Sequence, residues 1–260
     1  MKLKATSTLA LTALLATMPA LAQTAAPAPD YTISYNAGIT TDYRFRGISQ
    51  TSTKPALQLG ADFTHKDGFY LGAWGSNVSW IKDYVGGGAK GPLEIDLYGG
   101  YRSDTGMGVT YDLGLITYQY PGNTAGKVSN FANANTTEVY GAVTYSIVTA
   151  KYSRSLTNFI ANVNSKGSQY LEVAANFDLG NGFTVTPHVG RQTIPNAVPA
   201  NAGNYTDYSV TLGKDFGNGL SASVAAIGTN TNNVSKVFYT DTKGKFLGKD
   251  ALVVGLKYSF

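Results

Sequence analysis

The sequence contains no cysteine, only two histidines and few charged residues. Without cysteine, the chain can form neither a disulfide framework nor a thiolate metal site. Charged residues make up 14% of the chain, whereas soluble domains usually contain roughly 25%. The net charge is only +4 and the basic residues are scattered, which argues against nucleic-acid binding.

The chain also lacks a hydrophobic run long enough for a membrane-spanning helix, which needs roughly 20 residues. Lys2 and Lys4 precede a short run of mostly Ala, Leu and Thr, and Ala20-Leu21-Ala22 fits a cleavage site before Gln23. We expect a cleaved signal peptide over residues 1–22, with a retained anchor as the alternative. Residues 23–30 are rich in Ala and Pro and predict a disordered lead-in. Removal of Lys2 and Lys4 would lower the net charge to +2.

In the remaining sequence, apolar and polar residues alternate with a period of two. From Tyr31 to Arg46, the odd positions are mostly aromatic or aliphatic, and the even positions are polar, charged or glycine. Because successive side chains of a strand point to opposite faces, this pattern predicts a strand with one apolar and one polar face. Similar alternation recurs along the chain, with weaker patterns at 69–78 and 148–154, and gives about twelve strands over residues 31–260.

The links between these segments alternate in length. Short turns are expected at 66–68, 103–106, 146–147, 180–182 and 217–219, and long links at 47–54, 81–92, 121–135, 157–167, 193–204 and 229–248, the last with a possible hairpin at 241–244. Short turns at one end and long loops at the other are typical of transmembrane barrels, with the short turns periplasmic. We therefore predict an all-β fold, a closed antiparallel up-and-down barrel in which the first and last strands pair. Aromatic girdles are expected from Tyr31, Tyr101, Phe177, Tyr258 and Phe260 near the periplasmic interface, and from Tyr43, Phe45 and Tyr111 further along the lipid face.

Two segments carry a resemblance to a known family. The run Thr41-Asp42-Tyr43-Arg44-Phe45-Arg46-Gly47-Ile48-Ser49-Gln50 and the run Glu94-Ile95-Asp96-Leu97-Tyr98-Gly99-Gly100-Tyr101 resemble the TorF family of bacterial outer-membrane porins, whose transported substrate is not established. The resemblance extends over the mature chain and implies transport. The terminal strand also resembles the signal read by the barrel-assembly machinery, at Leu252, Val254, Leu256, Tyr258 and Phe260.

The predicted inward face holds the candidate functional residues. Its ionisable side chains are eight acids and five bases: Asp42, Asp62, Glu94, Asp96, Asp112, Glu138, Glu172 and Asp207, with Arg44, Arg46, Arg102, Lys151 and Lys257. The excess of acids suggests a mild preference for cations. Arg44 and Arg46, with Lys257 on the neighbouring strand, could form a basic patch that guides anions. The alternative is internal salt bridging of the two arginines with Asp42, Glu94 or Asp96.

Catalysis by a small barrel would need a Ser or Thr nucleophile activated by histidine. His65 is expected at a periplasmic turn and His188 in the lumen, with no nucleophile assigned beside either. We therefore expect no enzyme, no cofactor and no metal site.

The sequence thus predicts an outer-membrane channel for passive diffusion of small polar or ionic solutes. Its expected partners are outer-membrane lipids, small solutes and, during biogenesis, the barrel-assembly machinery, with no nucleic acid. The alternatives are a structural or adhesive barrel with a plugged lumen and functional surface loops, an outer-membrane lipid hydrolase, and a soluble all-β binding protein.

Overall fold

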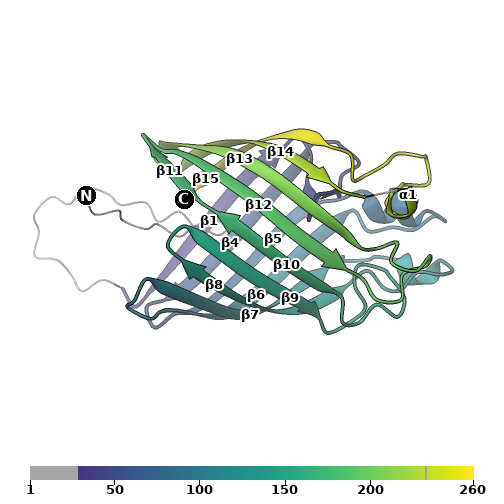
Figure 1. Ribbon diagram of the computed structural model, residues 1–260, viewed down its shortest axis with the longest axis horizontal. Helices are drawn as coiled ribbons and strands as arrows, with labels where there is room; N and C mark the ends of the chain where they lie inside the picture. Colours follow the sequence, from purple (N-terminus) through teal and green to yellow (C-terminus); the bar gives the residue numbers. More distant parts are fainter. Residues whose placement is uncertain (1–28, 232) are drawn as a thin grey trace, which may run out of the picture.

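The computed structural model describes residues 29–231 and 233–260, which form a closed antiparallel barrel with loops extending from one end (Figure 1). The expected signal peptide and most of the expected lead-in lie outside the described residues. The wall strands are β1 (Tyr31–Thr40), β4 (Ala56–His65), β5 (Phe69–Asn77), β6 (Leu93–Asp104), β7 (Val109–Gln119), β8 (Thr136–Tyr145), β9 (Val148–Ser155), β10 (Gln169–Ala175), β11 (Phe177–Gly180), β12 (Phe183–Thr193), β13 (Tyr205–Gly217), β14 (Leu220–Thr229) and β15 (Ala251–Ser259).

The wall has twelve strands, as predicted, because β10 and β11 are two parts of one strand. They are separated only by Asn176, and both pair with β12. The ring closes where β1 pairs with β15, with Ala37 opposite Tyr258. The backbone of Tyr35 also exchanges hydrogen bonds with that of Phe260, at 2.8 and 2.9 Å. Closure leaves no sheet edge with unpaired N–H and C=O groups, which would be costly in a medium without water.

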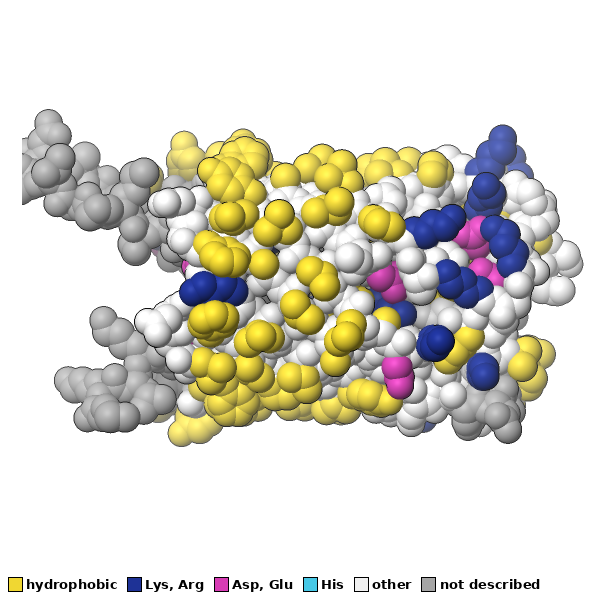
Figure 2. Space-filling view, turned by 90° about the horizontal axis from the view of Figure 1, so that it is seen from above, with side chains coloured by type: hydrophobic (Ala, Val, Ile, Leu, Met, Phe, Trp, Pro, Cys, Tyr) yellow, Lys and Arg dark blue, Asp and Glu magenta, His cyan; other side chains and the backbone are white. Residues whose placement is uncertain are grey.

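The period-two pattern has the predicted consequence for the two faces of the wall. Ile33, Leu97, Val173 and Leu256 lie on the outside, where they are 54%, 49%, 40% and 48% exposed. Asp96 points inward and is buried. Figure 2 shows, on the face in view, apolar side chains spread over the turn end and the middle of the barrel, while most Lys and Arg gather towards the loops. The apolar surface is therefore on the outside of the barrel and the polar surface on the inside.

Aromatic side chains collect at the turn end of the exterior. Tyr31 stacks on Phe63 at 5.6 Å between ring centroids, and Tyr258 stacks on Phe260 at 5.9 Å. The prediction that Tyr111 lies further along the lipid face, away from the turn end, was wrong. It lies two residues after the turn between β6 and β7, opposite Ser103 and 6.3 Å from the ring of Tyr101, so it belongs to the same end.

Six long loops lie at the other end: L1 (41–55), L2 (78–92), L3 (120–135), L4 (156–168), L5 (194–204) and L6 (230–250). L1 contains the two-stranded β2 (Arg44–Phe45) and β3 (Ile48–Ser49). The sequence did not predict the short helices, which are the π-helix η1 (Ile81–Val85), the 3-10 helix η2 (Ala125–Lys127) and the α-helix α1 (Asn233–Phe238). In the described part of the chain, no helix has the length and apolarity needed to cross a membrane. The expected turn near 241–244 is present, bracketed by pairing of Thr240 with Phe246.

The first strand is shorter than predicted. It ends at Thr40, and Arg44 and Phe45 form β2 inside L1 instead of continuing the wall. The placement of Tyr43 and Phe45 in a lipid-facing girdle was therefore wrong. The Tyr43 ring lies 5.2 Å from the inward-facing Trp74, and the Phe45 ring lies 5.3 Å from Tyr118.

The hydrophobic core lies at the loop end. Its buried members come mainly from L2 and L3, together with Tyr118 of β7 and Ala161 of L4, and Tyr43 and Phe45 of L1 pack against them. A smaller cluster joins Ile48 of L1 to Tyr205 and to Leu247 of L6. These contacts explain why L1 turns inward, because its aromatic side chains are buried among the loops instead of extending the outer face.

An outer face of this kind should tolerate charge poorly in a bilayer. Leu97→Arg, near the middle of β6, should lower the free energy of unfolding in lipid vesicles by roughly 2–4 kcal/mol. Met107→Arg is the control, because Met107 is 79% exposed in the turn between β6 and β7, and should change stability by less than about 0.5 kcal/mol. Urea unfolding followed by tryptophan fluorescence measures both. Equal effects of the two variants would contradict the lipid-facing assignment.

Candidate functional site in the barrel lumen

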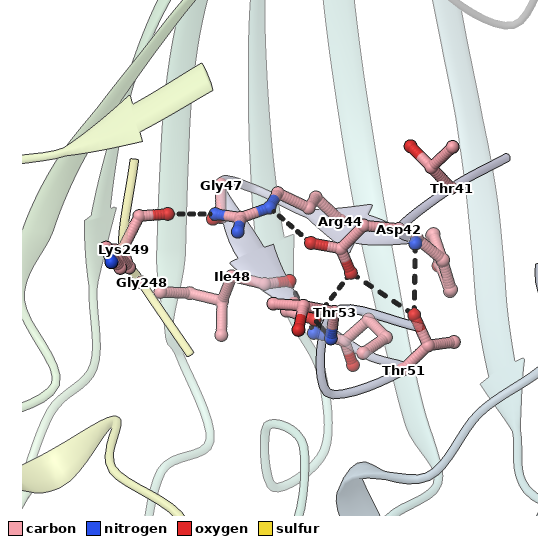
Figure 3. Close-up of polar contacts among 12 residues, drawn as sticks. Thr41, Asp42, Arg44, Gly47, Ile48, Thr51, Thr53, Gly248 and Lys249 are labelled. Atoms are coloured by element: carbon pink, nitrogen blue, oxygen red, sulfur yellow. Dashed lines mark hydrogen bonds and ion pairs between the residues drawn. The ribbon is translucent and has the colours of Figure 1, made fainter. Parts of the chain in front are cut away.

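L1 is held in its own shape by the carboxylate of Asp42, which accepts bonds from three side chains (Figure 3). Ser49 Oγ donates to Asp42 Oδ1 at 2.6 Å, and Thr51 Oγ1 donates to the same oxygen at 3.2 Å. Arg44 Nε donates to Oδ2 at 2.8 Å. Charge-assisted bonds are stronger than neutral ones, so Asp42 organises the loop around a buried negative charge.

Arg44 ties L1 to the end of L6, just before the last strand. Its Nη1 donates to the carbonyl oxygen of Gly47 at 2.9 Å and to that of Lys249 at 2.7 Å (Figure 3). The side chain is 2% exposed and pairs with Asp42. The guanidinium is therefore occupied within L1 and its neighbouring loop.

Arg46, at the tip of L1, contacts strands far from β1 in the ring. Its Nη2 donates to Glu138 Oε2 of β8 at 2.6 Å, and its Nη1 donates to Gln192 Oε1 of β12 at 2.8 Å. The guanidinium carbon lies 4.2 Å from the ring centroid of Tyr170 in β10. Tyr205 of β13 donates its hydroxyl to the Arg46 carbonyl oxygen at 2.8 Å. L1 therefore crosses the lumen and is anchored on the other side.

Both partners of this ion pair are removed from solvent. The side chains of Arg46 and Glu138 are 7% and 0% exposed. Burial by itself would lower the pKa of Arg46, but the Glu138 carboxylate more than offsets this effect and the pKa is raised. Arg46 stays charged, so breaking the pair would leave a buried, uncompensated ion on each side.

Gly47, next to Arg46, allows L1 to approach the wall closely. Its φ is +79°, and a Cβ here would lie 2.8 Å from the Asp207 Cβ and from the Thr229 Cγ2. Both the backbone conformation and the space therefore favour glycine.

L6 lies over L1 and L2. Lys245 Nζ donates to the Ser52 carbonyl oxygen at 2.5 Å, and Lys243 Nζ donates to Asp83 Oδ1 at 2.8 Å. Burial alone would raise the pKa of Asp83, but the hydrogen bond from Lys243 and the positive charge of Lys243 help to outweigh it, and the pKa is lowered. Lys243 is largely exposed, so this contact is weaker than the Arg46 anchor.

The turn half of the lumen is lined by a network of tyrosines and ion pairs. Asp112 of β7 accepts a bond from Arg102 Nη2 at 2.7 Å and another from the Tyr70 hydroxyl at 2.6 Å. The Tyr70 hydroxyl also contacts that of Tyr140 across the lumen at 2.5 Å. These phenols project from β5 and β8 and reduce the bore from within.

His188 lies in the lumen, as predicted, but not in the geometry of a general base. Its Nε2 lies 3.1 Å from Glu172 Oε2, and its Nδ1 lies 3.6 Å from Asp207 Oδ1. Ser209 is its register partner on β13. Because both ring nitrogens face carboxylates, neither is directed at that hydroxyl as hydrolytic chemistry would need.

The other lumen candidates pair with one another along the wall. Lys151 Nζ lies 3.9 Å from Glu172 Oε1. Tyr98 donates its hydroxyl to Asp62, and Asp62 is also the charged neighbour of Lys257. Lys257 therefore interacts with an acid and does not join Arg44 and Arg46 in a basic patch.

The outer face of the last strand carries the residues assigned to the assembly signal. All five side chains are exposed on the barrel exterior: Leu252, Val254, Leu256, Tyr258 and Phe260. In the described part of the chain, no group of three or more His, Cys, Asp or Glu side chains is arranged to hold a metal ion.

Sequence reasoning missed several residues that shape the lumen. Tyr70, Tyr140 and Tyr170 carry phenols and Gln192 carries an amide, so a list of acidic and basic side chains does not include them. Their positions in the period-two alternation were an available signal, since each residue lies on the same face as a charged residue of its own strand or of an adjacent strand.

The close approach of Gly47 predicts a specific loss of stability. Gly47→Ala should destabilise the protein by about 1–3 kcal/mol more than Gly106→Ala, because overpacking is added to the backbone cost. Gly106 is matched for backbone conformation, with φ of +76°, but a Cβ there meets nothing within 4 Å. Urea unfolding of both variants in the same vesicles measures the difference, and equal losses would mean that L1 does not pack on the wall.

Comparison with solved structures supports the barrel architecture. The KdgM porin in complex with disordered oligogalacturonate superposes with a TM-score of 0.52 and 9% identity, covering 88% of this chain and 98% of that one. The NanC porin gives a TM-score of 0.52 and 8% identity, covering 88% and 99%. At these identities the similarity shows the fold alone.

Comparison of sequences identifies the family. No match is found among curated proteins, and the narrower TorF label stays a prediction. The family described as bacterial protein of unknown function (Gcw_chp) matches residues 24–260. The chain therefore belongs to the Gcw_chp family.

Proposed function

We propose that the protein is an outer-membrane channel through which small polar or ionic solutes diffuse passively, with L1 as its constriction. The observation that carries this proposal is the crossing of a polar, charged lumen by one loop anchored at Arg46. The apolar exterior supports insertion in a bilayer, since a soluble all-β protein would bury such side chains. The long loops would then be extracellular, and the signal peptide over residues 1–22 would direct export.

The charges of the lumen favour small solutes over long acidic chains. One of the similar porins was solved with an oligogalacturonate. In this chain the inward-facing acids outnumber the bases. Arg44, Arg46 and Arg102 are each paired with a carboxylate. A polyanion would find no row of unpaired cations among these arginines, so we propose a channel with a mild preference for cations.

The alternative function is a structural or adhesive barrel whose loops contact other surfaces. The observation that favours it is the hydrophobic cluster of L1, L2, L3 and L4, which packs these loops against one another at the loop end of the barrel. The two proposals differ in whether the lumen conducts when L1 is released.

Planar bilayer recording tests the channel directly. Wild-type protein should show small or infrequent openings, and Arg46→Ala should increase the conductance or the open fraction at least several-fold, because L1 loses its anchor on β8 and β12. Arg44→Ala is the matched control, since the Arg44 side chain bonds to Asp42 and Gly47 within L1 and to Lys249, and not to β8 or β12. Silence of wild type and Arg46→Ala alike would favour the plugged barrel. Equal currents in the two arginine variants would contradict gating by the Arg46 anchor.

A further inference from the structure

Glu94 and Asp96 form a pair of carboxylates on the inward face of β6, near the loop end of the barrel. They are two residues apart on one strand, and their side chains interact with each other. Glu94 is 1% exposed and Asp96 is 7% exposed. Two acids are therefore buried side by side where β6 meets L1.

This pair differs from the other acids of the lumen, because each of the others has a basic neighbour. The neighbours are Arg44 for Asp42, Lys257 for Asp62, Arg102 for Asp112, Arg46 for Glu138, Lys151 and His188 for Glu172, and His188 for Asp207. Within residues 29–231 and 233–260, no Lys, Arg or His nitrogen lies within 4 Å of Glu94 or Asp96.

One oxygen of each carboxylate also lacks a hydrogen-bond donor. Glu94 Oε2 and Asp96 Oδ1 are buried and accept no bond from the described residues. Buried polar atoms of native proteins normally have a partner, and a buried carboxylate is either protonated or balanced by a positive charge. Because no base lies within 4 Å of the pair and one oxygen of each acid is unused, a positively charged ligand between them would supply both the missing charge and the missing contact.

The donor atoms around the pair are oxygens. Tyr43 of L1 donates its hydroxyl to Glu94 Oε1 at 3.0 Å. Burial, and next the charges of Glu94 and Asp96, raise the pKa of Tyr43, so the hydroxyl keeps its proton. Tyr118 and Tyr120 also lie near the two acids. An all-oxygen site with two carboxylates suits hard divalent cations and offers no nitrogen or sulfur to softer metals.

We propose that Glu94 and Asp96 bind a divalent cation of the calcium or magnesium class inside the barrel. Two negative charges would be balanced by one ion, with water or backbone oxygens completing its coordination. Because Tyr43 bonds to Glu94, the ion would also fix L1 against β6. Neither the binding nor this effect on L1 depends on conduction, and only an effect of the ion on the current would rest on the proposed channel.

Terbium luminescence tests the site, because Tb³⁺ replaces Ca²⁺ and is excited through nearby aromatic rings. Trp74 lies opposite Asp96 in the register and 5.2 Å from the Tyr43 ring. Folded full-length protein should give a luminescence signal that excess Ca²⁺ displaces. The isosteric double variant Glu94→Gln/Asp96→Asn should bind at least tenfold more weakly. Asp112→Asn, which removes another buried lumen acid, should keep the signal and its displacement.

Thermal unfolding provides a second readout that needs no conductance. Added Ca²⁺ should raise the Tm of wild type and of Asp112→Asn but not that of the double variant. Should the double variant fail to fold, the single variants Glu94→Gln and Asp96→Asn take its place. The proposal is overturned if wild type shows neither displaceable luminescence nor a Tm shift, or if the variants respond like wild type. A protein that binds Ca²⁺ yet never conducts would contradict the channel and leave the site intact.

Discussion

The buried ion pair between Arg46 and Glu138 is the interaction on which the interior of this barrel depends. Removing two charges from water is costly, and the cost is offset only while they face each other with their remaining hydrogen bonds satisfied. Arg46 comes from the loop after β1, and Glu138 comes from β8 in a distant part of the ring. The pair therefore fixes L1 across the lumen, and Gln192, Tyr170 and Tyr205 hold the same side chain or its backbone from three further strands.

The barrel wall and the loop end are stabilised by different forces. Along the wall, every strand is paired on both sides, and the apolar side chains face outward, so a hydrophobic core between layers is not needed. At the loop end, L1, L2, L3 and L4 bury aromatic and aliphatic side chains against one another, as a soluble protein does. Backbone pairing therefore holds the wall, and L1 adds polar contacts to the far strands to its packing among the loops.

Much of the wall could be predicted from the sequence. Alternation with a period of two specifies which face of each strand meets the apolar medium, and a slip of one residue would expose every polar side chain to it. The alternating lengths of the links identify the two ends. These are local properties of the chain, and the predicted order and closure of the strands were confirmed.

The course of L1 could not be predicted from the same pattern. Alternation continues through Tyr43 and Phe45, and these residues read as a continuation of β1 although the strand ends at Thr40. Their apolar side chains contact other loops instead of lipid, and a one-dimensional pattern does not distinguish the two environments. Gly47, followed by the polar run from Ser49 to Lys54, was the available signal for a turn. The partner of Arg46 was also out of reach, because Glu138 is 92 residues away.

The segment from Thr41 to Gln50, which resembles the TorF family, is also the segment that forms most of L1. Asp42 organises L1, and Arg44 ties L1 to Lys249. Arg46 anchors L1 on β8, and Gly47 allows the close approach to the wall.

The most direct test of this anchor is a double-mutant cycle of Arg46→Met and Glu138→Leu, with unfolding measured in lipid vesicles. The coupling energy should be about 1–3 kcal/mol, with the double variant more stable than either single variant, because the double variant leaves neither charge buried without its partner. Additive losses, with coupling near zero, would contradict an L1 loop anchored across the lumen.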